Sequence, residues 1–111
     1  MKKLFLTILG FILSTSAFSQ ILYITQNSDE ADLIIYITKD KNKADLVVFK
    51  TDYKLEAQDN HGIWFFTSFK NEAKKTIYFT QDNNKADLYI YITDKKYEAH
   101  WRNEQKKQLL E

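Results

Sequence analysis

Residues 34–46 read IIYITKDKNKADL and residues 76–88 read TIYFTQDNNKADL, so each stretch joins a β-branched, aromatic run to a polar segment ending in Ala-Asp-Leu. This thirteen-residue unit occurs six times, aligned on a threonine that is followed six residues later by an alanine. The pairs are Thr25/Ala31, Thr38/Ala44, Thr51/Ala57, Thr67/Ala73, Thr80/Ala86 and Thr93/Ala99. Two residues before each threonine stands an aromatic residue, namely Tyr23, Tyr36, Phe49, Phe65, Tyr78 or Tyr91. The repeat therefore dominates the chain.

The six units fall into two groups of three. Successive threonines are 13, 13, 16, 13 and 13 residues apart, which places three extra residues near positions 58–62. The spacing predicts two similar halves joined by this short insertion.

Each unit begins with five residues rich in β-branched and aromatic types, which is typical of a strand. The expected strands are 21–25, 34–38, 47–51, 63–67, 76–80 and 89–93. Both faces of these strands are apolar, with Lys50 as the one charged exception, and such strands are usually covered on both faces. The polar residues that follow suit a turn leading into a single helical turn that ends near Ala-Asp-Leu.

The connections between the expected strands are short. About eight residues separate one strand from the next, whereas a parallel crossover with a covering helix requires a dozen or more. An ordinary layered α/β sheet is therefore disfavoured. Three arrangements remain: a β-meander, a very tight solenoid, or strands that pair with non-sequential partners as the chain winds around an axis.

The N-terminus has the pattern of a signal peptide. Lys2 and Lys3 precede an apolar run at 4–13, and Ala17 and Ser19 supply small residues before a cleavage site. The apolar run is shorter than the roughly 20 residues that a spanning helix needs. We expect residues 1–19 to be removed before Gln20, although an uncleaved anchor is the alternative, and residues 20–111 to form one domain in the periplasm or outside the cell.

Composition limits the class of function. The chain has no cysteine, which excludes disulfides and a lipid anchor on a cysteine. Without Lys2 and Lys3 it carries 14 basic and 15 acidic residues, so nothing favours binding to nucleic acid, and we expect no stable membrane insertion after cleavage. Gly62 is the only glycine after residue 19, which excludes a glycine-rich phosphate loop.

Several motifs together resemble the septoil knot domain family. They are EADL at 30–33, KADL at 43–46 and 85–88, Gly62-Ile63-Trp64, and the closing Ala99-His100-Trp101-Arg102-Asn103. The similarity extends over about 21–110, although Gln58, Lys74 and His100 stand where other repeats have aspartate. The resemblance implies a small α/β domain whose backbone forms a seven-crossing torus knot, with no established biochemical activity. We therefore expect an α/β (α+β) fold, in which six strand–turn–helical-turn repeats are wound into a deeply knotted, compact domain.

Two sets of residues are candidate metal ligands. Asp32, Asp45 and Asp87 recur in register, and carboxylates are ligands for hard cations. Half of the repeats lack this acid, so local capping or pairing is the favoured interpretation. His61 and His100 are the only histidines, and without cysteine or a suitably spaced acid they are poor evidence for zinc.

The remaining candidates are two serines and two tryptophans. Ser28 and Ser68 lack the context of an activated nucleophile. Trp64 lies within an expected strand, where core packing is favoured over sugar stacking, and Trp101 follows the last repeat, where it would close one end of the fold. We accordingly expect no catalytic, cofactor-binding or metal-binding residue, no cofactor, and no enzymatic activity.

Two functions of different classes remain open. The first is a passive structural or protease-resistant module of the envelope or exterior, and the second is a binding module for surface polysaccharide or an envelope protein. The composition is compatible with a monomer in either case. A contiguous patch of exposed aromatic side chains would favour binding, and full burial of the aromatics would favour the passive role.

Overall fold

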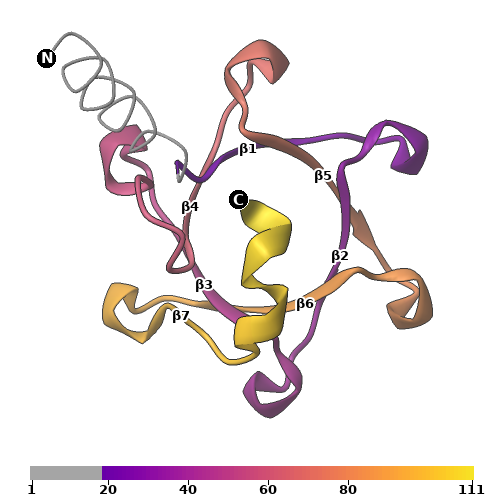
Figure 1. The fold of residues 1–111 in the computed structure, drawn as a ribbon, viewed down its shortest axis with the longest axis vertical. Helices are drawn as coiled ribbons and strands as arrows, with labels where there is room; N and C mark the ends of the chain where they lie inside the picture. Colours follow the sequence, from indigo (N-terminus) through magenta and orange to yellow (C-terminus); the bar gives the residue numbers. More distant parts are fainter. Residues whose placement is uncertain (1–18) are drawn as a thin grey trace, which may run out of the picture.

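The computed structural model describes residues 19–111, so the expected leader lies outside the described residues except for Ser19. The chain forms seven strands joined by short 3-10 helices (Figure 1). The strands are β1 (Ile21–Ile24), β2 (Leu33–Ile37), β3 (Leu46–Lys50), β4 (Ile63–Phe66), β5 (Lys75–Thr80), β6 (Leu88–Thr93) and β7 (His100–Trp101). The 3-10 helices are η2 (Ser28–Glu30), η3 (Lys41–Lys43), η4 (Lys54–Glu56), η5 (Lys70–Glu72), η6 (Asn83–Lys85), η7 (Lys96–Glu98) and η8 (Glu104–Leu110).

Strands β1 to β6 form a closed parallel barrel. Their order is β4-β1-β5-β2-β6-β3, and an additional pairing of β3 with β4 completes the ring. Closure leaves neither side of the barrel sheet as a free edge. The short 3-10 helices η2 to η7, which we call the outer turns, project outward around the ring (Figure 1).

The chain travels around the barrel axis twice. Strands β1, β2 and β3 lie two places apart in the ring, and β5 and β6 occupy the places between them. The step from β3 to β4 differs, because these two strands are direct neighbours. The three-residue insertion occurs at this step, where it brings the second lap into the gaps left by the first.

The expectation of an α/β fold is wrong. Within residues 19–111 there is no α-helix, and each outer turn is a single 3-10 turn of three residues. A 3-10 helix rises about 2.0 Å per residue and closes a hydrogen bond after three residues, so it suits a connection of about eight residues better than an α-helix. The domain is therefore mostly β, and of the three arrangements considered it adopts pairing with non-sequential strands.

Side chains on the inner faces of the strands fill the barrel. The buried cluster contains Leu22, Leu33, Ile35, Leu46, Val48, Trp64, Ile77, Leu88, Ile90, Trp101 and Leu110. Trp64 is fully buried and meets Phe66 edge-on, with ring centroids 6.2 Å apart. Its indole N–H has no acceptor among the described residues. Both Trp64 and Trp101 are thus core residues, as the sequence favoured.

The outer face of the barrel is only partly covered. The repeated aromatics Tyr23, Tyr36, Phe49, Phe65, Tyr78 and Tyr91 are all half-buried between the outer turns. The expectation that a layer of chain covers both faces is met only on the inner side, because the outer turns are too short to form a continuous second layer. In the part of the chain that the structure describes, no helix is long and apolar enough to span a membrane.

Gly62 ends the insertion with a backbone that other residues rarely adopt. Its φ is +96°, and a Cβ atom there would lie 2.5 Å from the carbonyl oxygen of Val47. Strand β4 consequently begins in contact with β3, which the closure of the barrel requires.

Candidate functional site

The repeated aspartates act as caps between strands. Each carboxylate accepts the backbone N–H of a residue in a strand of the other lap. The three bonds run from Thr76 N to Asp32 Oδ2 (2.8 Å), from Tyr89 N to Asp45 Oδ2 (2.9 Å) and from Ile34 N to Asp87 Oδ2 (2.8 Å). The aspartates therefore act as caps, but not local ones, because each cap joins residues 44 or 53 positions apart in the sequence. Within residues 19–111 no three His, Cys, Asp or Glu side chains gather closely enough to hold a metal ion.

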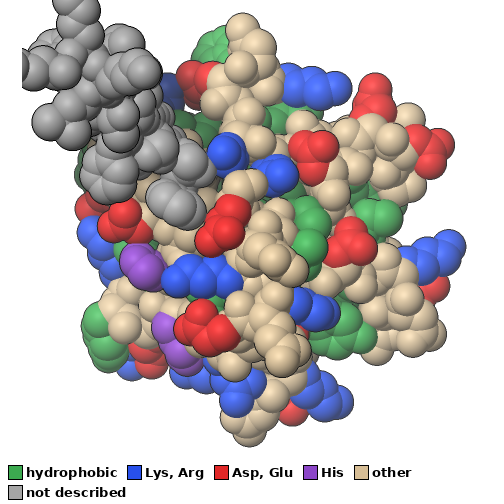
Figure 2. Space-filling model, in the orientation of Figure 1, with side chains coloured by type: hydrophobic (Ala, Val, Ile, Leu, Met, Phe, Trp, Pro, Cys, Tyr) green, Lys and Arg blue, Asp and Glu red, His purple; other side chains and the backbone are tan. Residues whose placement is uncertain are grey.

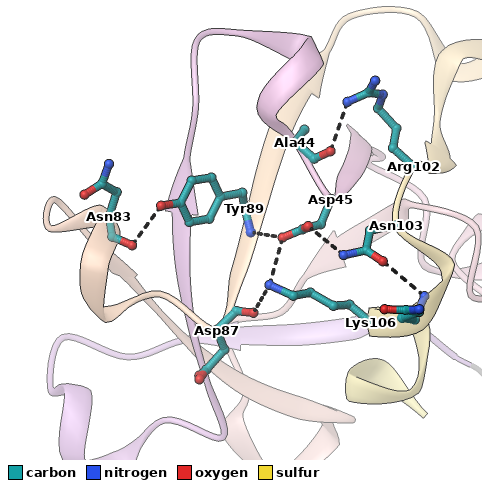
Figure 3. Close-up of polar contacts among 9 residues, drawn as sticks. Ala44, Asp45, Asn83, Asp87, Tyr89, Arg102, Asn103 and Lys106 are labelled. Atoms are coloured by element: carbon teal, nitrogen blue, oxygen red, sulfur yellow. Dashed lines mark hydrogen bonds and ion pairs between the residues drawn. The ribbon is translucent and has the colours of Figure 1, made fainter.

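Asp45 differs from the other two aspartates because it also binds the C-terminal segment (Figure 3). Its carboxylate accepts the side-chain amide of Asn103 at 3.2 Å and the ammonium of Lys106 at 3.3 Å. Its carbonyl oxygen accepts the backbone N–H groups of Arg102 and Asn103 at 2.8 and 2.9 Å. Asp45 therefore fixes the point at which the chain leaves the barrel wall.

Beyond Asp45, the C-terminal segment closes one end of the barrel, where η8 crosses the centre of the ring (Figure 1). The Lys106 ammonium also donates to the carbonyl of Asp87 at 3.1 Å, and the side chain of Gln20 donates to the carbonyl of Leu110 at 3.2 Å. The side chain of Asn60 donates to the carbonyl of Lys107 at 2.9 Å. The barrel residues in these bonds all precede strands, so η8 covers the end at which the parallel strands begin. We call this the closed end.

The two histidines do not form a site together. His61 is exposed and lines a hollow of about 260 Å³ with Asp59, Asn60, Lys107 and Glu111. His100 is exposed in β7, and its Nδ1 lies 2.7 Å from the carbonyl oxygen of Glu98. Neither histidine belongs to a cluster of side chains within residues 19–111 that could hold a metal ion.

The serines are also isolated. Ser28 begins η2 and Ser68 follows the strand β4, and both are exposed. No hydrogen bond among the described residues joins either hydroxyl to a histidine. The geometry thus provides no activated nucleophile within residues 19–111.

Ion pairs link four neighbouring outer turns. They join Lys41 to Glu98 (3.6 Å), Lys96 to Glu56 (2.7 Å) and Lys54 to Glu72 (2.9 Å). Because the ring places β2, β6, β3 and β4 in sequence, these pairs connect η3, η7, η4 and η5 in the same order. The turns η7, η4 and η5 are therefore held side by side.

The glutamates of these pairs also bond to the repeated threonines. Thr51, Thr67 and Thr93 each donate a hydroxyl to the glutamate five residues later. The hydrogen bond from Lys96, followed by that from Thr51, lowers the pKa of Glu56. The hydrogen bond from Thr67, followed by that from Lys54, lowers the pKa of Glu72, and the bond from Thr93 lowers that of Glu98.

The same three turns carry large exposed apolar side chains. Tyr53 (70% exposed) and Phe69 (68%) occupy equivalent positions at the starts of η4 and η5. Leu55 (79%) and Tyr97 (81%) are likewise equivalent, within η4 and η7. At these positions the remaining turns have polar residues, such as Asp40 and Asn42 in and before η3. We call Tyr53, Leu55, Phe69 and Tyr97 the turn aromatics, including the one leucine.

The turn aromatics do not stand out as a group in the sequence. Their signal was present, because Tyr53 and Phe69 are departures from the polar consensus at one repeat position. The sequence does not show that these turns are neighbours, because η7 and η4 are separated by about forty residues but lie next to each other in the ring.

The closed end carries charged side chains of both signs (Figure 2). Figure 2 shows basic and acidic side chains intermingled over this face, with the two histidines toward one side.

One comparison with known proteins gives a match. Residues 19–102 match the family model of the 7(1) septoil knot domain, which covers most of the chain and all six repeats. No curated protein and no solved structure matches the chain.

Proposed function

The chain belongs to the septoil knot domain family, and on that premise we propose that it is an exported, non-enzymatic module that resists proteolysis in the periplasm or outside the cell. The observation that carries this proposal is the closed ring of β1 to β6, which leaves neither side of the barrel sheet unpaired. Proteases bind extended backbone, so a chain must open locally before it is cut. A closed barrel with one covered end should open slowly, and slow local opening would protect the backbone from proteases.

The ends of the domain support the same proposal. The backbone N–H of Gln20 donates to the carbonyl of Ala57 at 2.6 Å, and Leu110 is fully buried. Ends of domains are otherwise common sites of fraying and cleavage. Without cysteine, the domain would achieve its durability in an oxidising compartment through topology and packing alone.

Limited proteolysis of the exported protein tests this function. We expect the processed chain to survive a non-specific protease under conditions that digest an unknotted β-domain of similar stability. Trp101→Ala, which should release the closed end, serves as the matched variant and should be cut faster. Rapid digestion of the unaltered protein in its native state would remove the basis of the proposal.

The turn aromatics favour a second candidate, a binding module for surface polysaccharide or an envelope protein. Exposed aromatic rings on a rigid support bind ligands with little loss of conformational entropy. The test is affinity electrophoresis against envelope polysaccharides, with co-precipitation of envelope proteins as the second arm. The double variant Tyr53→Ala, Phe69→Ala should lose retention, and Asn42→Ala with Asn84→Ala, at turn positions equivalent to Leu55 and Tyr97, should retain it.

A further inference from the structure

The end of the barrel opposite η8 is ringed by six equivalent residues. Each residue directly precedes the repeated threonine. Its side chain points to the same face of the strand as a core residue two positions earlier. In ring order they are Ile24, Phe79, Ile37, Ile92, Lys50 and Phe66. We call this ring the mouth. Five of its six members are apolar, and Lys50 stands between Ile92 and Phe66.

The mouth is open to solvent. Ile37 and Ile92 are 40% and 42% exposed, although the residues beneath them, Ile35 and Ile90, are fully buried. The C-terminal segment covers the opposite end, and no described element crosses the mouth. On the other side of the ring Ile24, Phe66 and Phe79 are half-buried against the core, and the rings of Phe66 and Phe79 meet edge-on with centroids 6.3 Å apart. The mouth is therefore exposed mainly at Ile37, Ile92 and Lys50.

Lys50 has no electrostatic partner. Its side chain forms no hydrogen bond and no ion pair with any residue of 19–111, and it is the one charged side chain at a position that is apolar in the other five repeats. The nearest acid in sequence is Asp52, and no ion pair joins the two. A partner that covered the mouth without an anion would leave the Lys50 ammonium unpaired and cost part of its hydration, which is unfavourable.

This charge requirement restricts what can bind. A neutral apolar partner leaves the ammonium unpaired, and a second copy of the mouth brings another ammonium to the contact. The occupant must instead combine hydrocarbon with one negative group. The interior below the mouth is filled by Trp64, Ile35 and Ile90, so an occupant lies across the ring and does not enter the barrel.

We propose that the mouth binds the carboxylate of a long-chain fatty acid, with the Lys50 ammonium at the carboxylate and the hydrocarbon chain across Phe66, Ile92 and Ile37. Two further apolar residues extend the available surface. Tyr53 follows Lys50 by three residues and Phe69 follows Phe66 by three, so both stand at the starts of turns that leave the mouth. Their backbone N–H groups donate to the hydroxyls of Thr51 and Thr67 at 3.1 and 3.0 Å, which holds these turns close to the strand ends.

The test is calorimetric titration of the protein with dodecanoate below its critical micelle concentration. Dodecanol and dodecyltrimethylammonium serve as neutral and cationic probes with the same hydrocarbon chain. We expect saturable 1:1 binding of dodecanoate, at least about tenfold weaker binding of dodecanol, and no binding of the cation. Amide chemical-shift changes should concentrate at the ends of β2, β3, β4 and β6.

Variants separate the charge from the apolar surface. Lys50→Gln should weaken dodecanoate binding by about tenfold and leave dodecanol unchanged, and Lys50→Glu should reverse the preference toward the cation. Lys85→Gln, an exposed unpaired lysine in η6, is the matched control and should have no effect. Since Lys50 is exposed, these variants should fold, which a proton–nitrogen correlation spectrum checks.

Four results would overturn the proposal. One is equal affinity for dodecanoate and dodecanol, and another is unaltered affinity of Lys50→Gln. The third is binding only to vesicles of acidic phospholipid, with no binding of monomeric dodecanoate, which would assign the mouth to a membrane surface. Shift changes confined to the hollow beside His61 would also contradict the assignment, because that hollow lies near the closed end.

Discussion

The carboxylate of Asp45 accepts the ammonium of Lys106 at 3.3 Å, across 61 residues of sequence. The same carboxylate caps Tyr89 at the start of β6, so one side chain connects the first lap, the second lap and the C-terminal segment. The carboxylates of Asp32 and Asp87 make only the strand cap. A repeated carboxylate has thus acquired an additional role where it meets the C-terminal segment.

The first prediction follows from that difference. Asp45→Ala removes the acceptor for three donors, whereas Asp32→Ala removes the acceptor for one. We expect losses in the free energy of unfolding of about 2–4 kcal/mol for Asp45→Ala and about 1 kcal/mol for Asp32→Ala. Urea denaturation monitored by tryptophan fluorescence measures both. Equal losses would indicate that the bonds to the C-terminal segment contribute nothing.

Gly62 provides the second prediction. Gly62→Ala places a Cβ atom 2.5 Å from the carbonyl oxygen of Val47 and forces alanine to a φ of +96°. We expect a loss of at least about 1–3 kcal/mol, because both the conformation and the contact are unfavourable. His61→Ala, at the exposed neighbouring position, should change the denaturation midpoint little. A Gly62→Ala protein with the original midpoint would contradict the contact between β3 and β4 described above.

The third prediction concerns the repeated alanines. Ala44 is buried, but Ala86 at the same repeat position is only half-buried. Ala44→Leu should therefore overpack the contact and destabilise by about 1–3 kcal/mol, and Ala86→Leu should cost less. Thermal unfolding of the two variants gives the comparison, and the reverse ranking would count against the closer packing of the third repeat.

Trp101 should control the rate of unfolding. It is buried at the closed end, where its indole N–H donates to the carbonyl and side-chain oxygens of Asn60 at 3.0 and 3.1 Å. The chain beyond it must leave the barrel end before the laps can separate, so we expect unfolding in strong denaturant on the order of hours. Trp101→Ala should also lower the free energy of unfolding by about 3–5 kcal/mol, as expected for such a truncation. We expect its unfolding rate to rise by more than this loss of stability alone would cause.

Manual-mixing fluorescence measures this rate, because Trp64 remains as a reporter in the Trp101→Ala variant. Tyr97→Ala, an exposed aromatic near the same end of the sequence, is the control and should unfold at the original rate. Unfolding of the unaltered protein within the mixing time would contradict a C-terminal segment that holds the barrel closed.

The lowered pKa values of Glu56, Glu72 and Glu98 predict acid sensitivity. A carboxyl group with a lower pKa in the folded state stabilises that state above its unfolded pKa, near the ordinary 4.5. The stabilisation is lost as the pH falls through the lowered value. The melting temperature should therefore decrease below about pH 4.5, and less steeply in high salt because the pairs are exposed.

Substitution of one pair tests the assignment. Glu72→Gln should flatten this dependence of melting temperature on pH, since glutamine cannot titrate. Glu104→Gln, which changes a glutamate without an ion pair among the described residues, should leave the dependence as it was. An identical acid profile for Glu72→Gln and the unaltered protein would exclude the Lys54 and Thr67 contacts as its cause.

Much of the local structure could be predicted from the repeat. The β-branched and aromatic run of each unit identified the strands, and the recurrence of Asp32, Asp45 and Asp87 indicated caps, although the caps were expected to be local and instead join strands of different laps. The helical character of the turns was overestimated. Ala-Asp-Leu resembles the end of a helix, yet the aspartate bonds to another strand and the segment before it has room for only one 3-10 turn.

What the sequence determined by itself was the period, the strand faces and the single charged exception at Lys50, because these depend on residues close together in the chain. The tertiary structure alone decided which strands are neighbours, which end η8 covers, and that η7, η4 and η5 lie side by side. Those features depend on pairings between residues 40 or more positions apart, such as Asp45 with Tyr89. A repeated sequence offers nearly equivalent partners for each strand, so only closure of the barrel selects among them.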